Sequence, residues 1–227
     1  MQVIGLDVSI IPGERYSVRD ALQELTGSDN VRVVMRTDTG ISGTGEIWFG
    51  RGEGAPQALA ALIENVLRPL VIGSDLSSPT PIYEAMLRET EYYGPFGLAM
   101  FGIAAVDVAM WDCIGKAKGV PCHEIWGMKK ERIPAYAMVG WIDFSEEQLA
   151  KVCAQAVAQG FGMVKIKVGN PTLEEDLRRV AVAREAVGPD IGIAMDANQV
   201  LDTAEAIRRG REFEKLGCVW WEEPLPK

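Results

Sequence analysis

The sequence predicts a protein in two parts, an α+β unit followed by repeated βα units that form a parallel sheet. In the first 130 or so residues, β-rich runs come first and helical patterns follow, which is typical of an α+β unit. After Ile133, strand and helix patterns alternate strictly. Repeats of this kind build either a doubly wound sheet or a (β/α)8 barrel. We therefore expect two domains, at residues 1–130 and 131–227.

Three strands are expected at the start of the first part. β-rich runs cover Val3–Ile11 and Val31–Arg36, and a glycine-rich turn at 40–45 leads into a third strand through Ile47 and Phe49. The three runs together predict a small antiparallel meander.

Three helices are expected after these strands. The first begins at Pro56, and its apolar residues recur on one face of a 3.6-residue helix. The second begins near Pro81, and the third covers Phe96–Ala117. Its apolar run, Phe96–Trp111, contains Asp107 and is shorter than the roughly 20 residues of a membrane span, so we expect a buried core helix.

Each helix of the second part has a start signal and ends in glycine. The glycines recur at intervals of 28 and 29 residues, and short strands are expected at 134–139, 163–168, 191–197 and 218–223. The opening pairs are Ser145 with Gln148, Thr172 with Glu175 and Asp202 with Glu205, and the closing residues are Gly160, Gly188 and Gly217. Four strands are too few for a closed barrel, which needs eight and typically about 250 residues. We therefore expect the chain to be truncated.

Composition and charge exclude several classes of partner. With a formal net charge of −9, the chain would be repelled by nucleic acid and by anionic membranes. The four cysteines form no CxxC pair, and nothing at the start of the chain resembles an export signal. A cytoplasmic protein is expected, with no nucleic-acid or membrane partner.

Ionisable side chains gather at or near the carboxyl ends of the predicted parallel strands, where catalytic groups of α/β proteins lie. Strand alternation places Lys165 and Lys167 on the same face of one strand. It places Asp196 and Asn198 on the same face of the next strand, and Glu222 and Glu223 on opposite faces of the strand after that.

Each signal has an ordinary explanation when taken alone. The lysines could form a solvated strand face, Asp196 could cap a helix, and Glu222 could begin a loop. The combination is more informative, because groups 29 and 26 residues apart on consecutive strands can converge on one site. Carboxylates from separate strands suit Mg²⁺, and a lysine beside a second cation has a lowered pKa and can act as a base.

Such a site suits removal of the weakly acidic proton α to a carboxylate. The reaction produces an enediolate, and a divalent ion stabilises its developing charge. A lysine or histidine base with magnesium is the arrangement described for enolase-type sites.

The sequence resembles the enolase superfamily, specifically the mandelate racemase group of the mandelate racemase / muconate lactonizing enzyme family. The resemblance covers essentially the whole chain. It is carried by Ala105-Val106-Asp107, Trp111-Asp112 and Gly115-Lys116 in the last long helix of the first part, and by Lys165-Ile166-Lys167, Met195-Asp196-Ala197-Asn198 and Trp221-Glu222-Glu223-Pro224 in the second. It implies an α+β capping domain followed by an incomplete (β/α)8 TIM-type barrel with about its first four strands.

The resemblance also implies roles for individual residues. Lys167 would be the base, with Lys165 tuning its pKa or contacting a carboxylate oxygen, and Asn198 would orient substrate or base. Asp196 and Glu222 would bind Mg²⁺, whereas Glu223 would be structural. In relatives the capping domain selects the substrate. The loop Pro12–Asp29 and the stretch Ile47–Glu53 would do so here, which makes Tyr16 and Trp48 candidate substrate-binding residues; core packing explains Trp48 equally well.

The chain departs from the family in what it lacks. The third carboxylate ligand and the His/Asp acid–base pair of the family come from later strands, and the single histidine, His123, is interpreted as structural. We expect the parent enzyme to be a homo-oligomer acting on a small carboxylate, either as an acid-sugar dehydratase, which is slightly favoured, or as a 2-hydroxy-acid racemase. The alternatives are a non-catalytic fragment and an unrelated magnesium-dependent barrel with phosphate chemistry.

Overall fold

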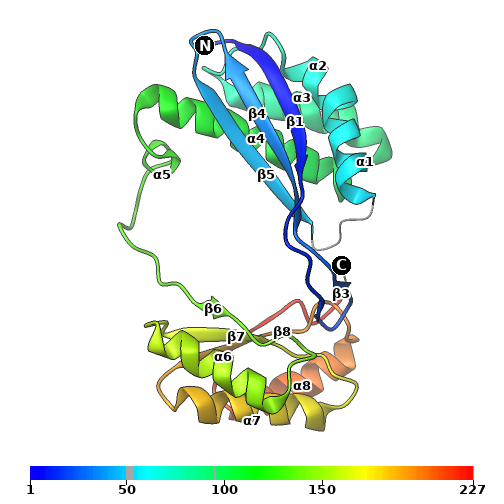
Figure 1. The fold of residues 1–227 in the computed structure, drawn as a ribbon, viewed down its shortest axis with the longest axis vertical. Helices are drawn as coiled ribbons and strands as arrows, with labels where there is room; N and C mark the ends of the chain where they lie inside the picture. The colour runs from blue at the N-terminus through cyan, green and yellow to red at the C-terminus, as the bar shows by residue number, and fades with distance from the viewer. Residues whose placement is uncertain (50–53, 95, 227) are drawn as a thin grey trace. The chain divides into compact units, whose positions relative to one another are not determined.

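The computed structural model describes residues 1–49, 54–94 and 96–226, and its contacts divide the chain into two units (Figure 1). Unit 1 comprises Met1–Tyr16 and Thr26–Glu131, and unit 2 comprises Ser17–Leu25 and Arg132–Lys227. The segment Ser17–Leu25 thus groups with unit 2, although the expected division placed it in the first domain. The reason is backbone pairing, because the Arg19 carbonyl accepts a hydrogen bond of 2.8 Å from the N–H of Ile142.

Unit 1 contains the predicted meander. Its strands are β1 (Val3–Ile11), β4 (Asp29–Thr37) and β5 (Ser42–Phe49), which pair antiparallel in the order β1-β4-β5. Val33 and Met35 in the central strand are fully buried, so one face of this sheet forms the core of the unit.

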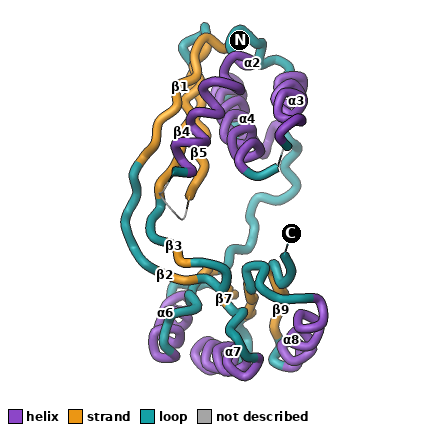
Figure 2. The backbone as a smooth tube through the Cα atoms, turned by 90° about the vertical axis from the view of Figure 1, so that its right-hand side faces the viewer, coloured by secondary structure: helices purple, strands orange, loops and turns teal. Residues whose placement is uncertain are grey.

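Helices cover that face of the sheet in unit 1 (Figure 2). The predicted helix from Pro56 is present, but a π-helical turn at Ile63–Leu67 interrupts it, and Pro69, which has no N–H to continue the α-helical ladder, follows this turn directly. The helices of the unit are α1 (Ala55–Leu62), α2 (Arg68–Val71), α3 (Pro79–Thr90), α4 (Leu98–Lys118) and α5 (Cys122–Ile125), with a 3-10 turn at Glu91–Tyr93.

Helix α4 is the core helix that the sequence predicts. By length and composition alone it could cross a membrane, but more than half of its most apolar stretch is buried inside the protein. It lies so close to β5 that glycine is required at two positions. A Cβ added to Gly45 would overlap the carbonyl oxygen of Ala105, and one added to Gly43 would lie 2.6 Å from the backbone nitrogen of Cys113.

We expect Gly45→Ala to destabilise unit 1 by about 1–3 kcal/mol, the usual cost of overpacking a core. Because the atom in the way belongs to helix backbone, it cannot move aside as a side chain would. Urea unfolding followed by circular dichroism measures the change. Gly162→Ala is the control, because nothing lies within 4 Å of its added Cβ. Equal stability of the two variants would contradict the packing argument.

Unit 2 is a four-stranded parallel sheet with helices on one face (Figures 1 and 2). The parallel βα architecture is confirmed, with the strands in sequence order. The first strand is shorter than predicted: among the described residues it pairs with β7 alone, and Pro134 cannot donate to a ladder. The strands are β6 (Ala137–Met138), β7 (Met163–Lys167), β8 (Gly192–Asp196) and β9 (Cys218–Glu222); the helices are α6 (Glu146–Ala158), α7 (Leu173–Val187) and α8 (Thr203–Lys215); the hairpin strands are β2 (Val18–Arg19) and β3 (Glu24–Leu25).

The predicted helix starts are also present. Ser145 and Thr172 each form a complete capping box with the residue three positions later, and the Asp202 side chain accepts a hydrogen bond from the N–H of Glu205. These local signals fix where each helix begins.

Candidate active site

Three ionisable residues form one row across the carboxyl edge of the parallel sheet. In the strand register Lys167 is paired with Asp196, and Asp196 is paired with Glu222. Lys165 lies one inward-facing position earlier on β7, opposite Ala194. The predicted convergence of these side chains on one face is therefore present in the structure.

The lysines and carboxylates in this row form ion pairs. Lys167 Nζ donates to Asp196 Oδ2 at 2.7 Å, and Lys165 Nζ donates to Glu222 Oε2 at 2.6 Å. Lys165 Nζ also lies 4.0 Å from Asp196 Oδ2, so one ammonium group is shared by both carboxylates. The two carboxylates are thus arranged around a positive charge.

Both lysines are buried, which rules out the interpretation of a solvated lysine face. Each is only 7% exposed, and the other face of the strand, with Val164 and Ile166, is fully buried against the helices. Burial lowers the pKa of Lys165, but the hydrogen bond and charge of Glu222, together with Tyr136, outweigh it and leave the pKa above its ordinary value. A charged Lys165 therefore occupies the site.

Two aromatic residues that the sequence reasoning missed contact these lysines. The ring centroid of Tyr136 lies 5.3 Å from Lys165 Nζ, and that of Trp141 lies 5.5 Å from Lys167 Nζ, both within cation–π range. Alternation from Met138 could have placed Tyr136 on the inner face of β6. Trp141 follows the strand in a loop, where no periodic signal exists.

The backbone is strained where β8 and β9 end. Asn198, Gln199 and Glu223 have φ values of 47°, 68° and 44°, which are left-handed conformations that cost non-glycine residues about 1–3 kcal/mol each. The Gln199 N–H donates to the Glu223 carbonyl at 2.7 Å, which ties the two loops together. Glu223 is exposed and Asn198 half-buried, and the Asn198 N–H donates to Asp196 Oδ1 at 3.0 Å.

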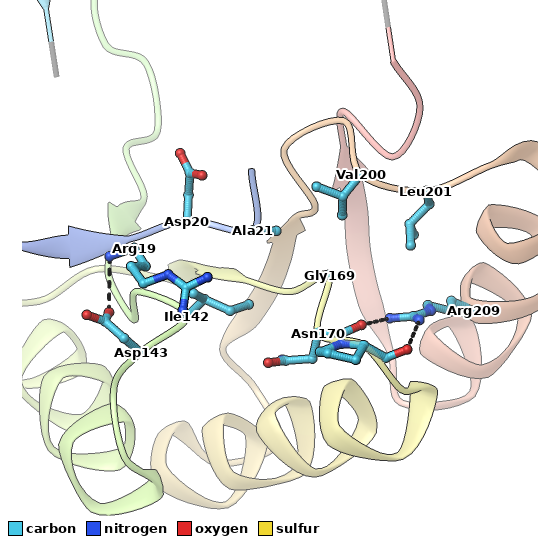
Figure 3. A pocket seen from close by; sticks show the side chains of 11 residues that line it. Arg19, Asp20, Ala21, Ile142, Asp143, Gly169, Asn170, Val200, Leu201 and Arg209 are labelled. Carbon is cyan, nitrogen blue, oxygen red and sulfur yellow. Dashed lines mark hydrogen bonds between the residues drawn. The ribbon is translucent and has the colours of Figure 1, made fainter. Parts of the chain in front are cut away.

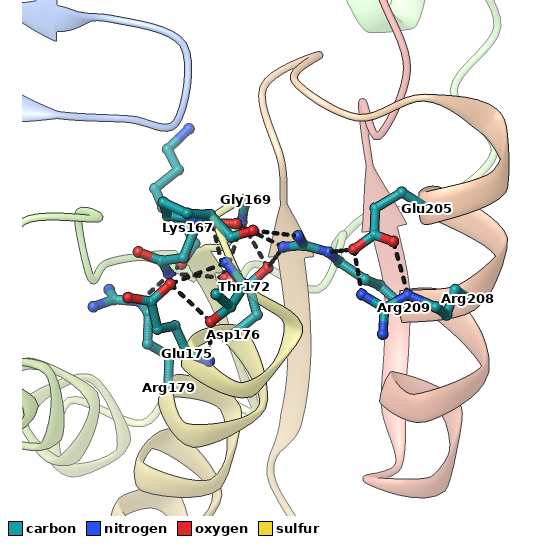
Figure 4. A network of polar contacts seen from close by, with 11 residues as sticks. Lys167, Gly169, Thr172, Glu175, Asp176, Arg179, Glu205, Arg208 and Arg209 are labelled. Atoms are coloured by element: carbon teal, nitrogen blue, oxygen red, sulfur yellow. Dashed lines mark hydrogen bonds and ion pairs between the residues drawn. The ribbon is translucent and has the colours of Figure 1, made fainter.

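A buried ion pair holds the loop that follows β7 (Figure 4). The carboxylate of Asp176 accepts hydrogen bonds from the backbone N–H groups of Gly169 and Asn170, each at 3.0 Å, and pairs with Arg209 at 2.5 Å. Arg209 in turn pairs with Glu205 and donates to the Asn170 carbonyl. The loop immediately after Lys167 is therefore fixed from two helices.

A hollow of about 420 Å³ lies beside these loops within unit 2 (Figure 3). Asp20 and Ala21 of the β2–β3 hairpin line it together with Gly169 and Val200. The four predicted catalytic and metal-binding residues, all within the described part of the chain, do not line it.

The remaining predicted residues lie in unit 1. Tyr16 is half-buried at the end of the first segment of that unit, and His123 is exposed in α5. Trp48 is 53% exposed on β5, so core packing does not explain it. Residues 50–53 of the predicted stretch Ile47–Glu53 lie outside the described part of the chain. Contacts of Tyr16 and Trp48 with a substrate stay predictions.

The donor set fits magnesium as a two-carboxylate site. Asp196 and Glu222 already share one cationic group, and their oxygens are the ligands that Mg²⁺ prefers. Within residues 1–49, 54–94 and 96–226, no group of three acidic, histidine or cysteine side chains could hold a metal. Mg²⁺ is commonly bound through one or two carboxylates, with water and substrate as further ligands.

An α+β capping domain joined to βα repeats, with lysines and carboxylates in one row at the strand ends, is an arrangement of the enolase superfamily. Residues 13–127 match the family model for the mandelate racemase / muconate lactonizing enzyme N-terminal domain, and residues 148–227 match the enolase C-terminal domain-like model. The chain belongs to the mandelate racemase / muconate lactonizing enzyme family.

Known proteins agree with this assignment. Arabinonate dehydratase from Saccharolobus solfataricus is 36% identical over 188 residues, which are 80% of this chain and 50% of that protein. L-talarate/galactarate dehydratase from Salmonella typhimurium, solved with Mg and L-lyxarohydroxamate, superposes with a TM-score of 0.87 at 28% identity, over 99% of this chain and 58% of that one. A racemase from Streptomyces coelicolor with bound magnesium superposes with a TM-score of 0.93 at 26% identity, over 99% of this chain and 63% of that one.

Further curated relatives include cycloisomerases. The chain spans about half the length of the curated relatives it matches. The predicted fold class, a capping domain followed by the first strands of a barrel, is confirmed by these comparisons.

Proposed function

We propose that this chain carries the proton-abstracting part of a magnesium-dependent enzyme that removes the proton α to a carboxylate of an acid sugar. The observation that carries the proposal is the row formed by Lys167, Asp196 and Glu222 across three neighbouring strands. The names of the relatives, arabinonate dehydratase and L-talarate/galactarate dehydratase, support a dehydratase acting on sugar acids.

In this proposal Lys167 takes the proton and Lys165 stays charged. Lys165, whose Nζ lies 5.3 Å from the ring centroid of Tyr136, would place a positive charge beside the base, where it could contact a carboxylate oxygen of the substrate. Asn198 would orient the substrate, because its Oδ1 is buried and has no hydrogen-bond partner among the described residues. That oxygen could accept a hydrogen bond from a substrate hydroxyl group.

Asp196 and Glu222 would hold the magnesium ion. When bound, the ion supplies positive charge that stabilises the enediolate as the proton leaves. Two solved relatives that contain magnesium support this assignment. When magnesium is bound, Lys165 and Lys167 would give up their present ion pairs with Asp196 and Glu222.

The test of the function is exchange of the α-proton in D₂O by the natural full-length protein. Aldonic and aldaric acids would be assayed beside mandelate-type 2-hydroxy acids, with and without removal of magnesium by EDTA. We expect exchange and loss of water with at least one acid sugar, and no exchange after EDTA treatment. Exchange that inverts configuration without loss of water would instead favour the racemase, which the Streptomyces coelicolor relative supports. Exchange that persists without a divalent ion would contradict the proposal.

Substitution of either metal ligand should weaken magnesium binding. We expect Asp196→Asn and Glu222→Gln each to lower the affinity at least as much as loss of an outer-shell partner does, about 10–100-fold. Isothermal titration calorimetry with MgCl₂ measures the effect directly. Glu223→Gln is the matched control, because Glu223 is the neighbouring glutamate and is exposed. An affinity lowered equally in all three variants would argue against the assigned ligands.

The alternative is that the 227-residue chain is not catalytic by itself. What favours this alternative is that only two carboxylates converge in the described part of the chain. We expect the isolated chain to bind Mg²⁺ weakly and to show no turnover. Turnover by the isolated chain would remove this alternative.

Two further expectations stay predictions. One is a homo-oligomeric assembly, and the other is a cytoplasmic location. The four cysteines are free in the structure, and burial raises the pKa of the Cys113, Cys153 and Cys218 thiols to about 11.

A further inference from the structure

A buried arginine on helix α7 donates hydrogen bonds to five backbone carbonyl groups of described residues. Arg179 is 8% exposed, and none of the described carboxylates forms an ion pair with it. Its five N–H donors reach five carbonyls: Nε donates to Lys167 at 3.2 Å, Nη1 to Ile142 at 3.3 Å and Phe144 at 3.1 Å, and Nη2 to Gly140 at 3.4 Å and Trp141 at 2.7 Å. Burial lowers the pKa of this guanidinium, although the charges of Asp176 and Asp143 nearby act in the opposite direction.

The five carbonyls belong to two segments that meet at the proposed base. One is the end of β7 at Lys167, and the other is the loop 140–144 that follows β6 (Figure 4 shows Arg179 beside Lys167). The N–H of Lys167 also donates to the Gly140 carbonyl at 3.0 Å, and the ring of Trp141 lies over Lys167 Nζ. Arg179 thus holds the backbone on both sides of the Lys167–Trp141 contact.

Burying a charged guanidinium costs free energy, and filling space in the core does not require it. An apolar side chain of similar volume would avoid the cost of burying a charge. Only a planar guanidinium, with donors in fixed directions, can hold five carbonyls at once, whereas a lysine ammonium has three donors at one point. The arrangement therefore fixes where the loop 140–144 stands relative to Lys167.

We propose that Arg179 is a positioning residue for the base. It fixes the carbonyls of Lys167 and Trp141, and so sets where Nζ of Lys167 stands against the Trp141 ring. This inference rests on the proposed function, in which Lys167 removes the α-proton. It adds a residue that touches neither substrate nor metal but acts through the base.

Helix α7 offers a matched control. Arg184 also donates to backbone carbonyls, those of Gly188, Ile191 and Gly217, in the last turn of the helix and beyond it. Arg184→Lys removes the same kind of hydrogen bonds, from a guanidinium group to backbone carbonyls, as Arg179→Lys does. A purely structural role would give both variants the same kinetic behaviour.

The first experiment compares the kinetics of the two variants in the natural full-length protein. We expect Arg179→Lys to lower kcat for α-proton exchange by up to about 100-fold, the loss that a misplacement of about 1 Å can cause. KM should change little, because the lost interaction acts on the reacting step. Arg184→Lys should keep the parental kcat.

The second experiment, amide hydrogen exchange, does not depend on activity. In Arg179→Lys the N–H of Lys167, bonded to the Gly140 carbonyl, should exchange faster than in the parent. The N–H of Ala197, bonded to the Glu222 carbonyl at 3.1 Å, should keep its protection. If Arg179→Lys does not fold, Arg179→Gln, which keeps an amide donor without the buried charge, is measured in the same way.

Equal kcat and equal Lys167 protection in the Arg179 and Arg184 variants would overturn the proposal. The proposed function fails in a different way, through full exchange activity in Lys167→Ala. Faster amide exchange at Lys167 in Arg179→Lys, with kcat unchanged, would also overturn the positioning role, because the backbone would then be loosened without consequence for the base.

Discussion

Replacing Lys167 by alanine is expected to lower the rate of α-proton exchange by roughly 10²–10⁴-fold, the usual contribution of a positioned general base. The loss is expected because Lys167 is the proposed base, whose Nζ lies in one row with Asp196 and Glu222, the proposed magnesium ligands. The measurement is incorporation of deuterium from D₂O into an acid-sugar substrate, followed by proton NMR, with the natural full-length protein.

Two control variants separate loss of the base from loss of structure. Lys167→Arg keeps a positive charge beside Asp196, but arginine does not give up its proton, so exchange should be lost although the ion pair remains. Lys151→Ala changes an exposed lysine of α6 and should exchange at the parental rate. If Lys167→Ala exchanges the α-proton as fast as the parent does, another residue is the base.

Removing the carboxylate of Asp176 is expected to cost about 3–5 kcal/mol of unfolding free energy, the cost of breaking a buried ion pair by removing one partner. Asp176 is fully buried and Arg209 is 3% exposed, so the guanidinium would lose its buried partner and keep Glu205, which is 26% exposed, as its carboxylate partner. The N–H groups of Gly169 and Asn170 would also lose their acceptor. Urea unfolding of Asp176→Ala at neutral pH measures the loss.

The control for this prediction is an exposed ion pair. Glu212→Ala removes the partner of Lys215 on the surface of α8, where the pair is worth less than about 1 kcal/mol. Asp176→Ala and Glu212→Ala should therefore differ clearly in their urea midpoints. Similar midpoints would mean that the loop after β7 does not depend on the buried pair.

The sequence was informative wherever the signal is local or periodic. The capping boxes at Ser145 and Thr172 involve residues three positions apart, so they can be read without knowledge of the fold. Strand alternation placed Lys165 and Lys167 on one face, and the repeat length brought Asp196 beside them. These features account for the predicted row of ionisable groups.

Features that depend on distant partners were not predictable. Asp176 and Arg209 look like solvent-exposed helix residues, because nothing local shows that the two charges meet across 33 positions of the chain. Arg179 is hidden for the same reason, since its acceptors are carbonyls that no sequence pattern identifies. Trp141 comes after its strand, where alternation no longer applies.

The pairing of Arg19 with Ile142 gives the protein an unusual connectivity. The backbone crosses between the two units three times, near residues 16, 25 and 131, rather than once. A single proteolytic nick near Glu131 would therefore leave the N-terminal fragment attached, because its segment Ser17–Leu25 would still be bound to the C-terminal fragment. For the same reason, dissecting this protein at one junction, or exchanging its first half with that of a relative, would also exchange a piece of the second half.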